Sequence, residues 1–217
     1  MSRACINLLG ETREYTDILA QMQAFTTARQ ATTPDEFWLL SHSPVFTQGL
    51  NGLPAHVLDA GDIPVVHTDR GGQVTYHGPG QLVLYTLVDL KRAGLGVREW
   101  VAALEQTVMD FMAARGVAAE RKAGAPGVYV GGAKIAALGL KVRQGRCYHG
   151  LSFNIDMDLS PFARINPCGM ARLPVTQWRD CYPAFEAGQA TFSAIGQELI
   201  HPLTQQLSRV KPHWNTP

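Results

Sequence analysis

The sequence lacks the features that mark membrane-spanning, exported and nucleic-acid-binding chains. No apolar run approaches the roughly 20 residues that a membrane-spanning helix needs. The 217 residues carry a formal net charge of +1 without a block of like charge, so charge gives no argument for nucleic acid or a membrane as a partner. The first residues become charged before any long apolar segment develops, so we expect no signal peptide and a cytoplasmic location.

Cysteine is scarce, and the four cysteines form no CxxC pair. Scattered histidines add no ligand cluster, so we expect no metal site and reduced thiols. Cys5 lies in an apolar strand pattern and is expected in the core, while Cys147 alternates within a strand. Cys181 lies in a loop beside Tyr-Pro, which leaves Cys168 as the candidate for a reactive thiol.

The sequence also has no internal repeat, no low-complexity segment and no linker long enough to separate domains. At 17% charged and 46% hydrophobic residues, its composition is typical of a globular protein with one sizeable core. We therefore expect residues 1–217 to form a single domain.

Hydrophobic periodicity predicts clustered strands separated by helices. The expected strands are 4–9, 36–40, 63–67, 81–90, 127–131, 133–142 and 146–155. The expected helices are 11–32 (stopped by Pro34), 97–115, a short one near 174–180, and 191–210 with a kink or break before Pro202; residues 41–56 read as a loop. This order predicts an α+β fold, a mixed or antiparallel sheet with helices packed on one face, and 81–90 as a central strand covered on both faces.

The segment RGGQVTYHGPGQ, residues 70–81, is unusually dense in special residues. Glycine allows a backbone to pass close to a ligand, and Pro79 removes a donor and fixes one φ. Arg70 and His77 supply a charge and a proton that can switch near neutral pH. The segment therefore predicts a ligand site, with a glycine-rich hairpin that only turns the chain as the alternative.

Cys168 lies in RINPCGM, where Pro167 and Gly169 predict a sharp turn. Such a turn holds a nucleophile clear of its neighbours and offers backbone N–H groups to an oxyanion. A thiol must ionise to attack, and a nearby cation lowers its pKa. Lys134, between glycines and an apolar strand, is the best candidate for that cation. The alternatives are a small buried side chain for Cys168 and a solvated lysine for Lys134.

A third candidate segment is YHGLSFNID, residues 148–156. Its His149 begins an alternating strand and either faces a site or packs as a hydrogen-bonded core histidine. Asn154 and Asp156 are expected to cap a turn.

These motifs together resemble those of lipoyl(octanoyl) transferases, which belong to the superfamily of lipoate and biotin protein ligases. The resemblance rests on residues 70–90, on GGAKIAALGL (131–140), on HGLSFNID (149–156) and on INPCGM (165–170). It extends from the first helix to about residue 180, and it implies a ligase-type α+β catalytic domain.

The resemblance implies transfer of an octanoyl group from octanoyl–acyl carrier protein to a lysine of lipoyl domains. The implied acceptors are the lipoyl domains of 2-oxoacid dehydrogenases and the glycine-cleavage H protein. Cys168 is implied to form the acyl-thioester, and Lys134 to lower its pKa. The implied substrate-binding residues are Arg70, Gly71, Gly72, Gln73, Val74, Thr75, Tyr76, His77, Ala137, Leu138, Gly139, Gly150, Leu151 and Ser152. The donor thioester is already activated, so we expect no nucleotide or other cofactor, and we expect a monomer.

Three other functions are compatible with parts of this pattern. An ATP-dependent lipoate–protein ligase shares the fold but has no need of a nucleophilic cysteine, so Cys168 favours the transferase. A non-catalytic module that only binds carrier protein would not need Cys168 and Lys134. A papain-like hydrolase needs a histidine partner and a cysteine at a helix start, and the sequence indicates neither.

Overall fold

The computed structural model describes residues 4–186 and 192–209. Its helices are α1 (Tyr15–Ala28), α2 (Leu90–Ala93), α3 (Val97–Ala113), α4 (Trp178–Cys181) and α5 (Phe192–Arg209), with the 3-10 turns η1 (Pro54–His56), η2 (Ser160–Arg164) and η3 (Pro167–Gly169). The strands are β1 (Cys5–Arg13), β2 (Glu36–His42), β3 (Val45–Gln48), β4 (Val65–His67), β5 (Val74–His77), β6 (Gln81–Asp89), β7 (Gly127–Val130), β8 (Ala133–Arg143) and β9 (Arg146–Asn154). None of the described helices is long and apolar enough to cross a membrane.

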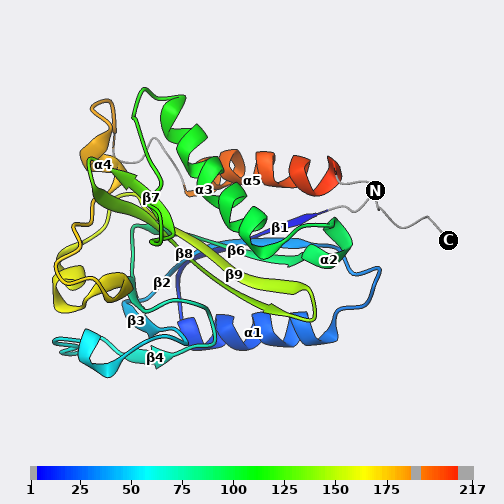
Figure 1. Ribbon diagram of the computed structural model, residues 1–217, viewed down its shortest axis with the longest axis horizontal. Helices are drawn as coiled ribbons and strands as arrows, with labels where there is room; N and C mark the ends of the chain where they lie inside the picture. The colour runs from blue at the N-terminus through cyan, green and yellow to red at the C-terminus, as the bar shows by residue number, and fades with distance from the viewer. Residues whose placement is uncertain (1–3, 187–191, 210–217) are drawn as a thin grey trace.

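The larger sheet has the strand order β1-β2-β6-β9-β8-β7 (Figure 1). The β1–β2 pair is parallel and all other neighbours are antiparallel, so the sheet is mixed as predicted. Strand β6 is an interior strand whose residues are buried from Gln81 to Val88, which confirms the expectation from its continuous apolar sequence. A small second sheet has the order β4-β3-β5.

Helices cover both faces of the larger sheet, and the expectation of one covered face was wrong. Helices α3 and α5 pack on one face around Trp100, Leu104 and Leu199, and α1 packs on the other through Ile18 and Met22 (Figure 1). Strands that are apolar on both sides need a cover on both sides, and this requirement decides the layering.

The first helix is shorter than its sequence pattern predicts. Strand β1 continues to Arg13 through two register shifts, so α1 begins at Tyr15 rather than at residue 11. The helix ends where Arg29 turns inward and pairs with Asp35 at 2.6 Å, before Pro34 is reached. Cys5, expected in the core, is exposed because β1 is an edge strand.

Three other segments differ from their predictions. Residues 41–56 contain β3, a buried strand that pairs with β4 and β5. Residues 174–176 are extended along Lys134, and the short helix α4 follows them instead of including them. Helix α5 continues through Pro202 without a break, while residues 191 and 210, the predicted ends of that helix, lie outside the described residues.

Candidate active site

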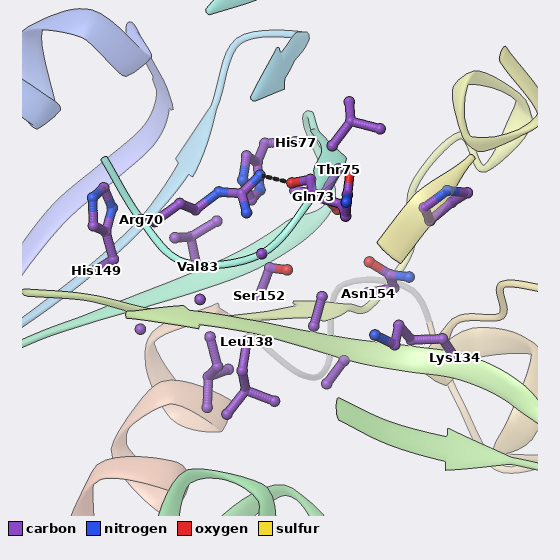
Figure 2. Close-up of a pocket in the computed structure, with 18 of the residues that line it drawn as sticks. Arg70, Gln73, Thr75, His77, Val83, Lys134, Leu138, His149, Ser152 and Asn154 are labelled. Carbon is purple, nitrogen blue, oxygen red and sulfur yellow. Dashed lines mark hydrogen bonds between the residues drawn. The ribbon is translucent and has the colours of Figure 1, made fainter. Parts of the chain in front are cut away.

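A pocket lies between the α1 side of the larger sheet and the segment that precedes and includes β5 (Figure 2). It encloses about 740 Å3 of empty space, its open mouth included. The floor consists of small residues in facing positions: Gly139 pairs with Gly150, and Ala137 pairs with Ser152. Small floor residues leave a trough in the sheet surface that larger side chains would fill.

Segment 70–73 forms the roof, and Arg70 holds it in place. The buried guanidinium donates to the carbonyl oxygens of Thr47 at 2.6 Å and Gln73 at 2.8 Å. The N–H of Gly71 donates to the carbonyl of Leu140 at 2.9 Å, which ties the roof to β8. A Cβ on Gly139 would lie 3.0 Å from the Gly71 carbonyl oxygen, so glycine at position 139 permits this close approach.

Lys134 lies at one end of the pocket (Figure 2). Its side chain is buried, and Nζ donates to the Pro126 carbonyl at 2.9 Å and lies 5.3 Å from the centre of the Tyr129 ring. The backbone N–H of Lys134 donates to the Pro174 carbonyl at 2.8 Å, and the Lys134 carbonyl accepts from the N–H of Thr176 at 2.9 Å. Lys134 is therefore not the solvated surface lysine of the alternative interpretation.

Cys168 belongs to η3, a tight turn that ends in Gly169 at φ 72°. The prediction of a sharp turn is thus confirmed. Pro167 borders the same pocket as Lys134, and the N–H of Asn166 donates to the His56 carbonyl at 2.8 Å. The side chain of Cys168 lies outside the described part of the structure, so its proximity to the ammonium of Lys134 stays a prediction.

His149 lies at the opposite end of the pocket from Lys134 (Figure 2). It is buried with φ 62°, and its Nε2 is 3.0 Å from Oδ1 of Asp69. The other carboxylate oxygen of Asp69, Oδ2, accepts a hydrogen bond from the Tyr148 hydroxyl. Burial alone would raise the pKa of Asp69, but these bonds outweigh it and hold that pKa well below its usual range. Burial lowers the pKa of His149 despite the opposing effect of Asp69, so the ring is neutral and carries one proton. The carboxylate can only accept, so that proton is on Nε2, and Nδ1, which has no described partner, is a bare acceptor. His149 thus both packs and borders the site.

A hydrogen-bonded chain of polar side chains connects His77 on β5 to the residues around Lys134. The His77 ring shares a 2.7 Å bond with Gln81, which donates to Asn154 at 2.9 Å. Asn154 in turn donates to the carbonyl of Thr176 at 2.9 Å, beside the backbone of Lys134. Burial and the neighbouring His42 lower the pKa of His77 to about 3, so His77 is neutral and a weak base in this state.

The comparisons with known proteins agree on one family. A family model described as the lipoyl protein ligase A/B catalytic domain matches residues 14–199. Octanoyltransferases from Thiobacillus denitrificans and Chromobacterium violaceum are 64% and 59% identical, covering 73% and 77% of this chain and 73% and 81% of theirs. An octanoyltransferase from Stutzerimonas stutzeri is 55% identical over 89% of this chain and 86% of its own. The chain belongs to the octanoyltransferases of this family.

Two solved structures share the fold of this octanoyltransferase although their sequence identity to it is low. A lipoate-protein ligase A bound with ATP superimposes with a TM-score of 0.72 at 14% identity, covering 95% of this chain and 86% of that one. The biotin protein ligase of Aquifex aeolicus with biotin and ATP gives 0.59 at 9%, covering 96% and 72%. These likenesses confirm the ligase-type fold and say nothing further of the reaction.

Most of the substrate-binding residues predicted for this octanoyltransferase border the pocket. They are Arg70, Gly72, Gln73, Val74, Thr75, His77, Ala137, Leu138, Gly139, Gly150, Leu151 and Ser152. Leu151 also belongs to the hydrophobic core on the α3 side, and the partly buried Leu138 packs against that core. Gly71 anchors the roof, and Tyr76 packs against Phe46 and Phe162, so these two residues do not border the pocket. Substrate binding stays a prediction for the whole set.

Sequence reasoning missed several residues that border the pocket. Tyr15, Val83, Tyr85, Ile135, Ala136, Phe162 and Val175 contribute from five separate segments. Asn154, expected to cap a turn, is instead buried in the pocket wall. Alternation in β6 places Val83 and Tyr85 on one face, but only the strand order shows that this face is the site. Among the described residues, no group of three or more histidines, cysteines and carboxylates could hold a metal ion.

Proposed function

We propose that this octanoyltransferase takes its acyl group from octanoyl–acyl carrier protein and passes it through a thioester on Cys168 to a lysine of lipoyl domains. The acceptors in this proposal are the lipoyl domains of 2-oxoacid dehydrogenases and the glycine-cleavage H protein. The transferase activity itself follows from relatives that are 55% to 64% identical and bear that name.

The observation that carries the route is the hydrogen-bonded ammonium of Lys134 at one end of a pocket that is bordered by Pro167, the neighbour of Cys168. A cation beside a thiol favours the thiolate, which is the attacking form. Apolar surface at Val74 and Val83 suits the tail. Burying eight carbons contributes on the order of 6 kcal/mol before ordering costs.

In the first step, the Cys168 thiolate attacks the donor carbonyl, a C–S bond forms, and the carrier's phosphopantetheine thiolate leaves. Lys134 gives that thiolate a proton and becomes a neutral amine. Within η3, Pro167 has no N–H and that of Gly169 donates to the Asn166 carbonyl at 3.0 Å, so the backbone N–H of Cys168 is the candidate to stabilise the oxyanion of the tetrahedral intermediate. The difficult transfer is thereby divided into two easier steps.

In the second step, neutral Lys134 accepts one proton from the acceptor's ammonium group, and the resulting amine attacks the thioester. An amide bond forms, the Cys168 thiolate leaves, and the second proton passes to solvent. The enzyme returns to its thiolate and ammonium state. Lys134 rather than His77 is our choice of base, because His77 is a weak base in its buried site.

The test is the intact mass of the purified enzyme after incubation with octanoyl–acyl carrier protein and no ATP. We expect the mass to rise by one octanoyl group, and no rise for Cys168→Ala. Formation of octanoyl-adenylate that requires ATP would favour the ligase reaction. Binding of carrier protein without any acylation would favour the non-catalytic module.

Three further assignments are part of this proposal. They are a single domain over residues 1–217, a cytoplasmic location, and a monomeric state. The family match over residues 14–199 supports the first.

A further inference from the structure

The ammonium of Lys134 is held by the peptide group between Pro126 and Gly127. The carbonyl oxygen of that peptide accepts the 2.9 Å hydrogen bond from Nζ. Pro126 itself is exposed at the end of a turn, so its own side chain does not fix the carbonyl direction. The direction therefore depends on what holds the N–H of Gly127.

That N–H donates to the carboxylate of Glu105 on α3. The distance from Gly127 N to Glu105 Oε1 is 2.9 Å, and the bond is buried. The second carboxylate oxygen accepts from Nε of Arg121 at 2.9 Å, so both oxygens of a buried carboxylate have partners. A carboxylate acceptor strengthens the bond to a peptide N–H and polarises the carbonyl of the same peptide.

Gly127 also leaves the space that the ammonium occupies. Its φ is 143°, and a Cβ at this position would lie 2.8 Å from Cε and 3.0 Å from Nζ of Lys134. The peptide thus sets the position of the ammonium through its carbonyl and through the absence of a side chain.

We propose that Glu105 is a positioning residue for Lys134, acting through the Pro126–Gly127 peptide. This inference rests on the proposed role of Lys134 toward Cys168. Without the Glu105 acceptor, the peptide loses the hydrogen bond on its N–H side, and the carbonyl that accepts from the ammonium is held less firmly. The thiolate of Cys168 is then less stabilised, and proton transfer to the leaving thiol slows.

The test compares Glu105→Met, which removes the acceptor at similar volume, with Glu105→Gln, whose amide oxygen can still accept from Gly127. Arg121, with 39% of its side chain exposed, can turn to solvent in the glutamine variant. Glu198→Ala is the matched control, since Glu198 pairs with Arg115 at 2.8 Å on the exposed side of α5.

The readout is the pH at which Cys168 is half-reactive toward iodoacetamide, followed by peptide mass spectrometry. Site-specific detection is needed because Cys5 is exposed, whereas burial raises the pKa of Cys147 to about 12. We expect the methionine variant to shift this midpoint upward by about one pH unit and to slow acylation at neutral pH about tenfold. We expect the glutamine variant and the control to stay near wild type.

The outcomes separate this inference from the proposed function. Lys134→Met is measured in the same assay: a wild-type midpoint there would contradict the role of Lys134 itself. A shifted midpoint for Lys134→Met with an unchanged one for Glu105→Met would overturn the role of Glu105 alone. If the methionine variant does not fold, Glu105→Asp, which shortens the reach by one methylene, takes its place with the same expected shift and the same overturning result.

Discussion

The two faces of the larger sheet are built from the same strands, but one packs in the hydrophobic core and the other forms the floor of the pocket. The face toward α3 and α5 carries large apolar side chains such as Phe37, Leu84 and Phe153, all fully buried. The face toward α1 carries glycine and serine at the pocket floor, represented by Gly139 and Ser152. Alternation along each strand allows one face to provide stability while the other keeps an empty trough.

Polar groups follow the same division. The pocket face holds buried histidines and amides joined in hydrogen-bonded chains, among them His42, His77 and Gln81. The α3 face is held mainly by apolar contact. Buried polar networks fix geometry only when their members are satisfied, so the pocket face is the more sensitive to changes of charge.

The largest expected effect separates stability from activity. Leu84 and Val83 are consecutive residues of β6 that point to opposite faces. We expect Leu84→Ala to lower the free energy of unfolding by about 2–5 kcal/mol through the cavity it leaves, with turnover of the folded enzyme unchanged. We expect Val83→Ala to cost less stability and to weaken binding of the octanoyl chain. Urea unfolding measures the stability of both variants, and steady-state kinetics measure their turnover and substrate binding. Equal losses of stability would contradict the assignment of stability to one face and substrate binding to the other.

The next effect is on chemistry alone. Lys134→Met removes the ammonium and keeps the apolar stem, so we expect acylation at pH 7 to fall about 100-fold with the fold intact. Single-turnover acylation by octanoyl–acyl carrier protein measures the rate, and circular dichroism checks the fold. A rate within twofold of wild type would remove Lys134 from the mechanism.

A larger side chain in the pocket floor tests whether the octanoyl chain binds in the trough above it. A side chain at Gly139 would meet the roof, since even a Cβ lies 3.1 Å from Cδ of Arg70. We expect Gly139→Val to raise KM for the octanoyl donor about tenfold or more. Gly116→Ala is a control in an open turn, where an added Cβ meets nothing within 4 Å, though its φ of 76° strains the backbone. If both variants keep the wild-type KM, the trough does not hold the acyl chain.

The smallest effect is on the pH dependence of stability. Burial lowers the pKa of His42 to about 4, and burial together with His42 lowers that of His77 to about 3. The unfolded chain therefore binds more protons below about pH 6.5, and stability that is complete above this pH falls as pH drops toward 4. We expect His42→Gln to reduce the slope by about 1 kcal/mol per pH unit in this window. Thermal unfolding between pH 4 and 7.5 measures it, and parallel curves would contradict buried, neutral His42.

Local sequence signals predicted the elements whose pattern is strong. The continuous apolar run of β6 indicated an interior strand, and the short gap between the predicted strands 133–142 and 146–155 contains the β8–β9 turn, where Gln144 and Gly145 have positive φ. The glycine-rich segment predicted a ligand site, and Arg70, Gly72 and His77 from it border the pocket, while ligand binding there stays a prediction. These features depend on residues near one another in sequence.

The rest depends on contacts between distant segments. Strand β3 is four residues long between Pro44 and Gly49, and its pairing with β4 and β5 has no local signature. In the sequence, Glu105 is only one polar position on an amphipathic helix. Its contact with the N–H of Gly127 is seen only in the folded structure. Asp69 likewise gains its role from His149, 80 positions along the chain.

The most direct test of the central claim is the kinetic competence of the acylated enzyme. Octanoyl-enzyme is isolated from its donor and mixed rapidly with excess lipoyl domain, and the acyl group is followed by mass spectrometry. We expect transfer to the acceptor lysine at a rate at least equal to kcat, with free enzyme restored. An acyl group that stays on Cys168, or that transfers more slowly than kcat, would contradict the route through the thioester.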